Sequence, residues 1–195
     1  MHTTYHDGLA HVFDEERPEV RWLVMPDTDT GDPRENWTGF VEMTVIRRSW
    51  PDRGDSPEGK LSEVFERYWQ EYDDDKALEL TRRWAVAFGG YDEAGVEEQV
   101  ILYSARGYSQ GDWWDVFVAV EPGYGSAEGY AEEWEQWARG DVYMIQRERF
   151  EACGLEGCED DPEEEETHWV EDADWLGGIY SDDAEDAVKY YEEGM

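Results

Sequence analysis

The charge balance is the feature that most constrains how this chain can fold. Of its 195 residues, 51 are Asp or Glu and 16 are Lys or Arg, a formal net charge of −35 at pH 7. Self-repulsion on this scale opposes a compact state. The 11 Trp, 12 Tyr and 6 Phe residues counteract this repulsion, because aromatic side chains bury large apolar areas. The composition therefore predicts a folded chain with an aromatic-rich core.

The sign of the charge also restricts the partners. Binding to nucleic acid phosphates requires Lys and Arg, so we expect no direct contact with nucleic acid. An anionic membrane surface would repel the chain, and the sequence has no run of 18 apolar residues. Residues 1–10 are neither basic nor hydrophobic, so a cytoplasmic location is predicted. A field of this sign attracts metal ions or basic protein surfaces.

Hydrophobic periodicity predicts an α+β fold with a mainly antiparallel sheet and three to four helices. The clearest helix starts at Leu61, from which apolar residues recur at helical spacing to Tyr72. A hairpin is expected over 99–120, because two β-rich runs flank a short turn. The other expected elements are strands at 20–25, 37–50 and 142–150, and helices at 74–88, 126–139 and 182–193, the last capped by Ser181.

The chain divides by composition into three parts. Residues 1–19 hold three of the four His and show little periodicity, so they are expected to form a loosely held N-terminal arm. Residues 20–150 would form the α+β core. Residues 151–195 carry eighteen Asp and Glu against one Lys. Because this strongly acidic segment also contains Trp and Ile residues, we expect it to pack back on the core.

One short motif suggests catalysis. Residues 107–111 spell G-x-S-x-G, the pattern of the nucleophile elbow in serine hydrolases. An elbow requires a helix after the turn, whereas residues 113–120 have the composition of a strand, which favours a hairpin turn. His168 is the one downstream His, in an acidic segment. A small serine hydrolase using Ser109 is therefore the enzymatic alternative, and no catalytic residue is assigned.

Two residue groups resemble metal sites but are incomplete. Asp27 begins a stretch like the start of a calcium loop, yet Thr38 stands where the bidentate Glu belongs. Cys153, Cys158 and His168 would need a fourth ligand to hold zinc. We therefore predict neither a metal nor a cofactor.

The remaining candidate is the acidic surface itself. Duplex DNA carries closely spaced negative charges, and a folded protein with fixed carboxylates can offer a DNA-binding protein a similar potential. A merely solvated acidic surface is the alternative, while salt adaptation is disfavoured by the high Trp content. The predicted partner-binding residues lie in the last quarter of the chain: Asp160, Asp161, Glu163, Glu164, Glu165, Glu166, Trp169, Glu171, Asp172 and Asp174.

Three segments carry a resemblance to known sequences. Residues 106–112 read R-G-Y-S-Q-G-D, 140–143 read G-D-V-Y, and 175–180 read W-L-G-G-I-Y before an acidic helix. In this respect the chain resembles a family of acidic phage and mobile-element proteins that has no established activity. It departs from the family pattern at Met144, where a Gly is usual, and at 173–175, where Ser-Cys-Trp is usual.

The resemblance implies a phage-type protein acting in the host cytoplasm. Together with the charge, it leads to one main hypothesis: a non-enzymatic DNA mimic that inhibits or modulates a basic nucleic-acid-binding host protein. Restriction, CRISPR or transcription machinery would be the target class. A structural or assembly role in the phage particle is a further alternative, and a homodimer is compatible with the sequence.

Overall fold

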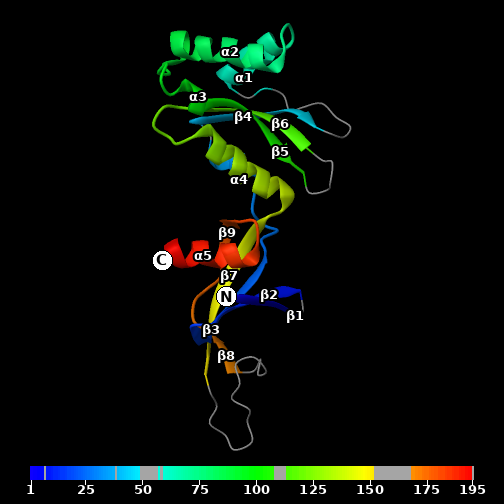
Figure 1. Ribbon diagram of the computed structural model, residues 1–195, viewed down its shortest axis with the longest axis vertical. Helices are drawn as coiled ribbons and strands as arrows, with labels where there is room; N and C mark the ends of the chain where they lie inside the picture. Colours follow the sequence, from blue (N-terminus) through cyan, green and yellow to red (C-terminus); the bar gives the residue numbers. More distant parts are fainter. Residues whose placement is uncertain are drawn as a thin grey trace, which may run out of the picture. The chain divides into compact units, whose positions relative to one another are not determined.

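The computed structural model describes residues 1–6, 8–37, 39–48, 57, 59–107, 113–151 and 168–194. The chain forms two compact units. Unit 1 comprises Met1–Thr30 and Gly140–Met195, and unit 2 comprises Gly31–Arg139. Both units combine helices with antiparallel strands (Figure 1), which confirms the predicted α+β class.

Unit 1 is built on one antiparallel sheet with the strand order β1-β2-β3-β7-β8. A further strand, β9, pairs with β7 beside Val142–Ile145, while β8 pairs with the other end of β7 at Glu148–Phe150. The elements of unit 1 are β1 (His2–His6), β2 (Leu9–Asp14), β3 (Arg17–Pro26), β7 (Val142–Phe150), β8 (Trp169–Glu171), β9 (Leu176–Tyr180) and α5 (Ala184–Gly194).

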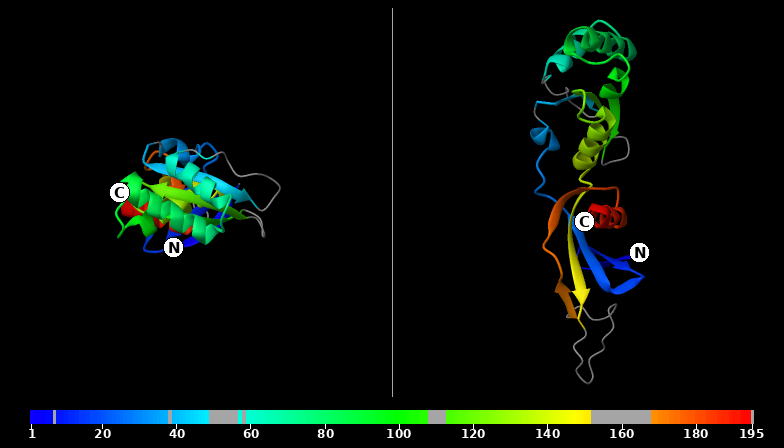
Figure 2. Two further views of the ribbon diagram at one scale, coloured as in Figure 1. Left: turned by 90° about the horizontal axis from the view of Figure 1, so that it is seen from above. Right: turned by 90° about the vertical axis from the view of Figure 1, so that its left-hand side faces the viewer.

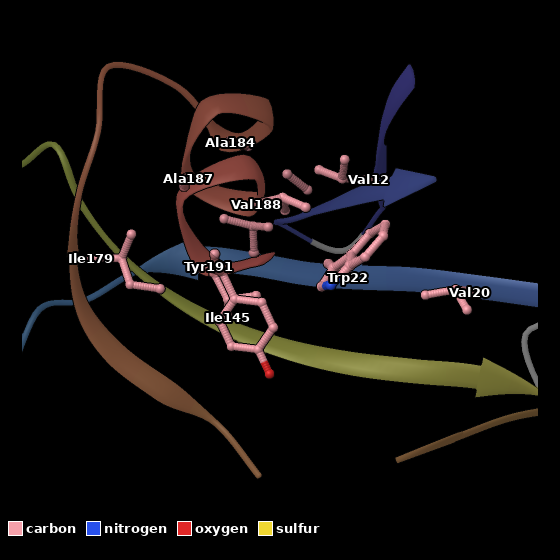
Figure 3. Close-up of a cluster of buried hydrophobic side chains, with 11 residues drawn as sticks. Val12, Val20, Trp22, Ile145, Ile179, Ala184, Ala187, Val188 and Tyr191 are labelled. Carbon is pink, nitrogen blue, oxygen red and sulfur yellow. The ribbon is translucent and has the colours of Figure 1, made fainter. Parts of the chain in front are cut away.

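Helix α5 covers one face of this sheet (Figure 2), and the core of unit 1 lies between the two. Ala187 and Val188 of the helix are fully buried, and Tyr191 is 4% exposed. They pack on Trp22 and Ile145, which come from the central strands β3 and β7 (Figure 3). The side of α5 that faces the sheet is formed by Ala184, Ala187, Val188 and Tyr191.

Unit 2 has a three-stranded antiparallel sheet with β6 in the centre. Its strands are β4 (Val41–Arg48), β5 (Val100–Arg106) and β6 (Trp113–Val120). The helical elements are the 3-10 helix η1 (Pro33–Asn36), α1 (Lys60–Trp69), α2 (Asp74–Trp84), the π-helical turn η2 (Ala85–Gly89), the four-residue α3 (Val96–Gln99) and α4 (Ala127–Arg139).

Strand β6 is buried on both faces, which explains its nearly continuous apolar sequence. Val116 and Val118 pack towards α4, together with Trp134. Phe117 faces the opposite side, where its ring stacks on Phe65 of α1 at a centroid distance of 4.7 Å. Unit 2 is therefore a sheet between two helical layers (Figures 1 and 2), and aromatic residues contribute to both layers of its core.

The division into units differs from the expected one. Residues 1–19 are not a loose arm: they contain β1 and β2, and β2 is paired with β3 from Ala10 to Asp14. The expected core of residues 20–150 is split, because 20–30 and 140–150 belong to unit 1. Residues 168–194 pack in unit 1 through β8, β9 and α5. Unit 1 is thus assembled from two distant parts of the chain.

Candidate functional site

The cations of unit 1 are all engaged inside unit 1. Its sequence contains 27 Asp and Glu but only five Lys and Arg, a net charge of −22. All five lie in the described ranges, and each is within 3.3 Å of a carboxylate. The pairs are Arg17 with Asp14 and Glu192, Arg21 with Glu148, Arg147 with Asp172, Arg149 with Glu151, and Lys189 with Asp186. Unit 1 therefore presents a surplus of carboxylates that its own Lys and Arg cannot neutralise.

One part of this surplus lies on residues 170–176, which run from β8 to the first residue of β9 and which we call the acidic edge. Along this segment, the backbone N–H groups of Asp172 and Ala173 donate to the carbonyl oxygen of Arg147, at 3.0 and 3.3 Å. The Asp172 carboxylate also lies 3.3 Å from Nε of Arg147. These contacts hold the acidic edge against the middle of β7.

The acidic edge combines charge with apolar surface. Glu171, Asp172 and Asp174 are exposed. Between and beside them, Val170 is 37% exposed, Trp175 36% and Leu176 50%. Exposed aromatic and aliphatic side chains among polar neighbours are typical of protein-binding surfaces. The acidic edge can therefore offer both carboxylates and apolar anchors to a partner.

A buried polar cluster supports the acidic edge from inside. Arg21 of β3 is 3% exposed, and its Nε donates to Glu148 of β7 at 2.8 Å. The same guanidinium lies 4.5 Å from the ring centroid of Trp169 and 3.2 Å from Nδ1 of His11. A buried charge is tolerated only when it is paired in this way. The cluster thus joins β2, β3 and β7 to the start of β8.

Trp169 was expected to contact a partner, but its side chain is buried. Its side chain is 8% exposed and packs edge-on against Phe13 and Phe150, with centroid distances of 6.0 and 5.4 Å. The ring is enclosed within unit 1, where its buried apolar area stabilises β8. It is therefore not exposed to a partner. The exposed indole of the acidic edge is Trp175, which the sequence analysis placed in the fold but not in the site.

Asp27 holds strand β9 just beyond the acidic edge. Its Oδ2 accepts a hydrogen bond from the N–H of Gly178 at 2.9 Å. A Cβ atom on Gly177 would lie 2.5 Å from the same oxygen, so the close approach requires a glycine. Burial acts to raise the pKa of Asp27, but hydrogen bonds from Thr30, Gly178 and Asp29 outweigh it and lower the pKa. The ionised carboxylate therefore anchors β9, because it accepts these hydrogen bonds.

Several expected site residues lie outside the described residues. They are Asp160, Asp161, Glu163, Glu164, Glu165 and Glu166, together with Ser109, Cys153 and Cys158. Of the predicted partner-binding set, the structure describes Trp169, Glu171, Asp172 and Asp174 and places all four on β8 or the acidic edge.

The surroundings of the G-x-S-x-G motif differ from those of a hydrolase elbow. Strand β5 ends at Arg106, immediately before Gly107, and the next described element, β6, is a strand. Arg106 pairs with Trp113 in an antiparallel register. The motif therefore joins two neighbouring strands, whereas an elbow leads from a strand into a helix.

The described residues contain no group of three or more His, Cys, Asp or Glu arranged to hold an ion, and Cys153 and Cys158 lie outside them. At the candidate calcium loop, Asp27 accepts backbone N–H groups and Asp32 accepts hydrogen bonds from Arg34. Across the described ranges, none of the helices is both long and apolar enough to span a bilayer.

No family model matches the sequence, and neither a curated protein nor a solved structure matches the chain. The resemblance to phage proteins stays a prediction. A function for this chain is therefore argued from the geometry and charge of its own surface.

Proposed function

We propose that the chain binds a basic, nucleic-acid-binding protein in place of nucleic acid, with the acidic edge of unit 1 as part of the contact. The observation that carries the proposal is the charge pairing of unit 1: its five Lys and Arg are all used internally, and a net charge of −22 is left. Opposite potentials steer association and favour a cationic partner. The phage resemblance directs this proposal to restriction, CRISPR or transcription proteins of a bacterial host.

Contacts within unit 1 hold the acidic edge in place, whereas a solvated acidic tail has no fixed conformation. Asp172 is held by one backbone hydrogen bond and an ion pair to Arg147, its neighbour Ala173 donates a second backbone hydrogen bond to the same carbonyl oxygen, and β8 is held by the buried Arg21 cluster. The backbone that carries these carboxylates is thus held in place, so less conformational entropy is lost when a partner binds them. Trp175 and Leu176 would add apolar contact to a charge-driven encounter.

The test is competition with DNA. The chain is used to capture a basic protein from a bacterial lysate, and the purified target is then bound to a fluorescent duplex. We expect the chain to displace the duplex, and its own affinity for the target to fall steeply as NaCl is raised, because the contact depends on charge. Affinity that is unchanged between low and high salt, or a complex that leaves the duplex bound, would overturn the proposal.

Matched variants locate the contact. The double variant Glu171→Gln/Asp174→Asn removes two charges from the acidic edge, and Glu98→Gln/Glu132→Gln removes two exposed charges from unit 2. Two lost ion pairs of about 0.7 kcal/mol each correspond to about tenfold weaker binding. Only the acidic-edge variant should show this loss. An equal loss in both variants would show that net charge acts without a defined surface.

A further inference from the structure

A cavity of about 520 Å³ lies within unit 2, beside the start of α1 and the turn η2. Its volume is in the range of small-ligand sites. Four aromatic residues and two carboxylates line it, namely Phe40, Trp84, Phe88, Tyr91, Glu42 and Glu121. These residues come from segments that are up to 81 positions apart, so the fold alone brings them together.

The aromatic side of the cavity already interacts with a cation. The Nζ atom of Lys60 lies 4.9 Å from the ring centroid of Trp84. Phe88 is tilted against Trp84 with a centroid distance of 5.6 Å, and its side chain is 72% exposed. Ring faces attract ammonium and guanidinium groups through their quadrupole. Lys60 also lines the cavity, so this contact shows that the wall attracts an ammonium group and that a ligand cation would compete with Lys60 for the face of Trp84.

The polar side of the cavity contains a half-buried carboxylate. Oε2 of Glu42 accepts hydrogen bonds from the N–H groups of Leu61 and Ser62, at 2.7 and 2.9 Å, and so caps α1. Burial nevertheless raises the pKa of Glu42, because loss of solvent outweighs these hydrogen bonds. A positive charge in the cavity would offset that loss.

Tyr91 lies close to both carboxylates of the cavity. The residue is 9% exposed and lines the cavity. Burial, followed by the negative charges of Glu42 and Glu121, raises the pKa of Tyr91 to about 12. The negative charges beside Tyr91 favour a cation in the cavity.

We propose that this cavity binds an organic cation, a guanidinium or alkylammonium group, between the aromatic wall of Trp84 and Phe88 and the carboxylates of Glu42 and Glu121. An arginine or lysine side chain and a free polyamine share this chemistry. The site lies wholly in unit 2, so it is independent of the acidic edge, and either proposal can fail without the other.

The test is an NMR titration of the full chain with N-acetyl-arginine amide at a salt concentration that screens non-specific attraction. N-acetyl-citrulline amide is the neutral control of the same shape. We expect saturable shifts of the amides of Phe88, Tyr91 and Glu121 with the arginine probe, and at least fivefold weaker binding of the citrulline probe. Equal binding of both probes would overturn the proposal.

Variants decide whether the cavity itself binds. Phe88→Ala and Glu121→Gln change exposed residues, and each should weaken the arginine probe about two- to fivefold. Tyr72→Ala and Glu98→Gln are the matched controls at other exposed positions of unit 2 and should leave the affinity unchanged. A loss in the control pair equal to that in the cavity pair would overturn the site.

Spermidine distinguishes the source of the cation. If spermidine shifts the same amides at a concentration at least tenfold lower than the arginine probe, with the same dependence on Phe88 and Glu121, the site takes a free polyamine. If it does not, and the arginine probe behaves as expected, the site takes a protein side chain. Either result, with the variant dependence, supports an organic cation in the cavity.

Discussion

Single carboxylates in this chain act as structural acceptors despite the surplus of negative charge. Asp27 anchors β9 through the N–H of Gly178, Glu42 caps α1, and Glu135 joins α4 to β5. Each lies close to backbone N–H groups that it satisfies. The chain has 51 acidic residues, and a sequence pattern cannot distinguish these three carboxylates from the solvated ones. The N–H groups that donate hydrogen bonds to them come from distant segments.

The pH dependence of Asp27 tests its anchoring role. Its pKa is lowered in the folded state, so its stabilising contribution is present above the unfolded pKa and is lost as the pH falls through the folded pKa. We expect Asp27→Asn to destabilise unit 1 by about 1 kcal/mol at neutral pH. The difference from the unmodified chain should shrink below about pH 4. Urea unfolding at low protein concentration measures it, and a difference that is constant with pH would contradict this role.

Glu135 allows a sharper comparison. It is 8% exposed and accepts hydrogen bonds from the Tyr103 hydroxyl at 2.5 Å and the Arg106 N–H at 2.7 Å. Glu135→Ala leaves both donors without this acceptor and should cost about 2–3 kcal/mol in the free energy of unfolding. Glu135→Gln retains an acceptor oxygen and should cost less. Urea unfolding of the two variants checks the order, and equal losses would show that packing, not hydrogen bonding, is responsible.

At the scale of elements, the sequence pattern predicts a helix or strand correctly where the apolar residues of that segment determine its structure. The expected helix from Leu61 corresponds to α1 at Lys60–Trp69, and the expected strand at 113–120 corresponds to β6 at Trp113–Val120. The hairpin was also correct, since β5 and β6 are antiparallel neighbours. In these segments the period of the apolar residues is clear and the partner is adjacent in sequence.

Prediction failed where the partner is distant. Strands β1 and β2 were expected to be a loose arm, because their own pattern is weak and β2 depends on β3 and α5 for burial. Asp183 accepts the N–H of Asp186 at the start of α5, whereas Ser181 was the expected cap. Both residue types can cap a helix, so the sequence pattern alone does not distinguish them. The cavity of unit 2 was not predicted either, because Glu42 and Tyr91 meet only in the folded chain.

At the scale of the whole molecule, the charge is unevenly divided. Unit 1 has a net charge of −22 in 86 residues, and unit 2 has −13 in 109 residues. Repulsion among surface charges is screened by salt, with a Debye length of about 10 Å at 0.1 M. We therefore expect added NaCl to stabilise both units, and unit 1 more than unit 2. Hydrogen exchange of core amides in β3 and β6 at low and high salt measures the two responses separately. Equal responses, or a larger one in β6, would contradict this expectation.

The discontinuity of unit 1 has a consequence for how the protein is made. On the ribosome, β3 leaves the exit tunnel more than a hundred residues before β7, its central partner. Unit 2 is contiguous, so it can complete its fold while the first three strands still wait. We expect nascent chains stalled shortly after Arg139 has emerged to protect unit 2 from protease and to leave residues 1–30 open to cleavage. Strands β8 and β9 and helix α5 would then become ordered after unit 2, so a translation product truncated before β8 would lack the acidic edge.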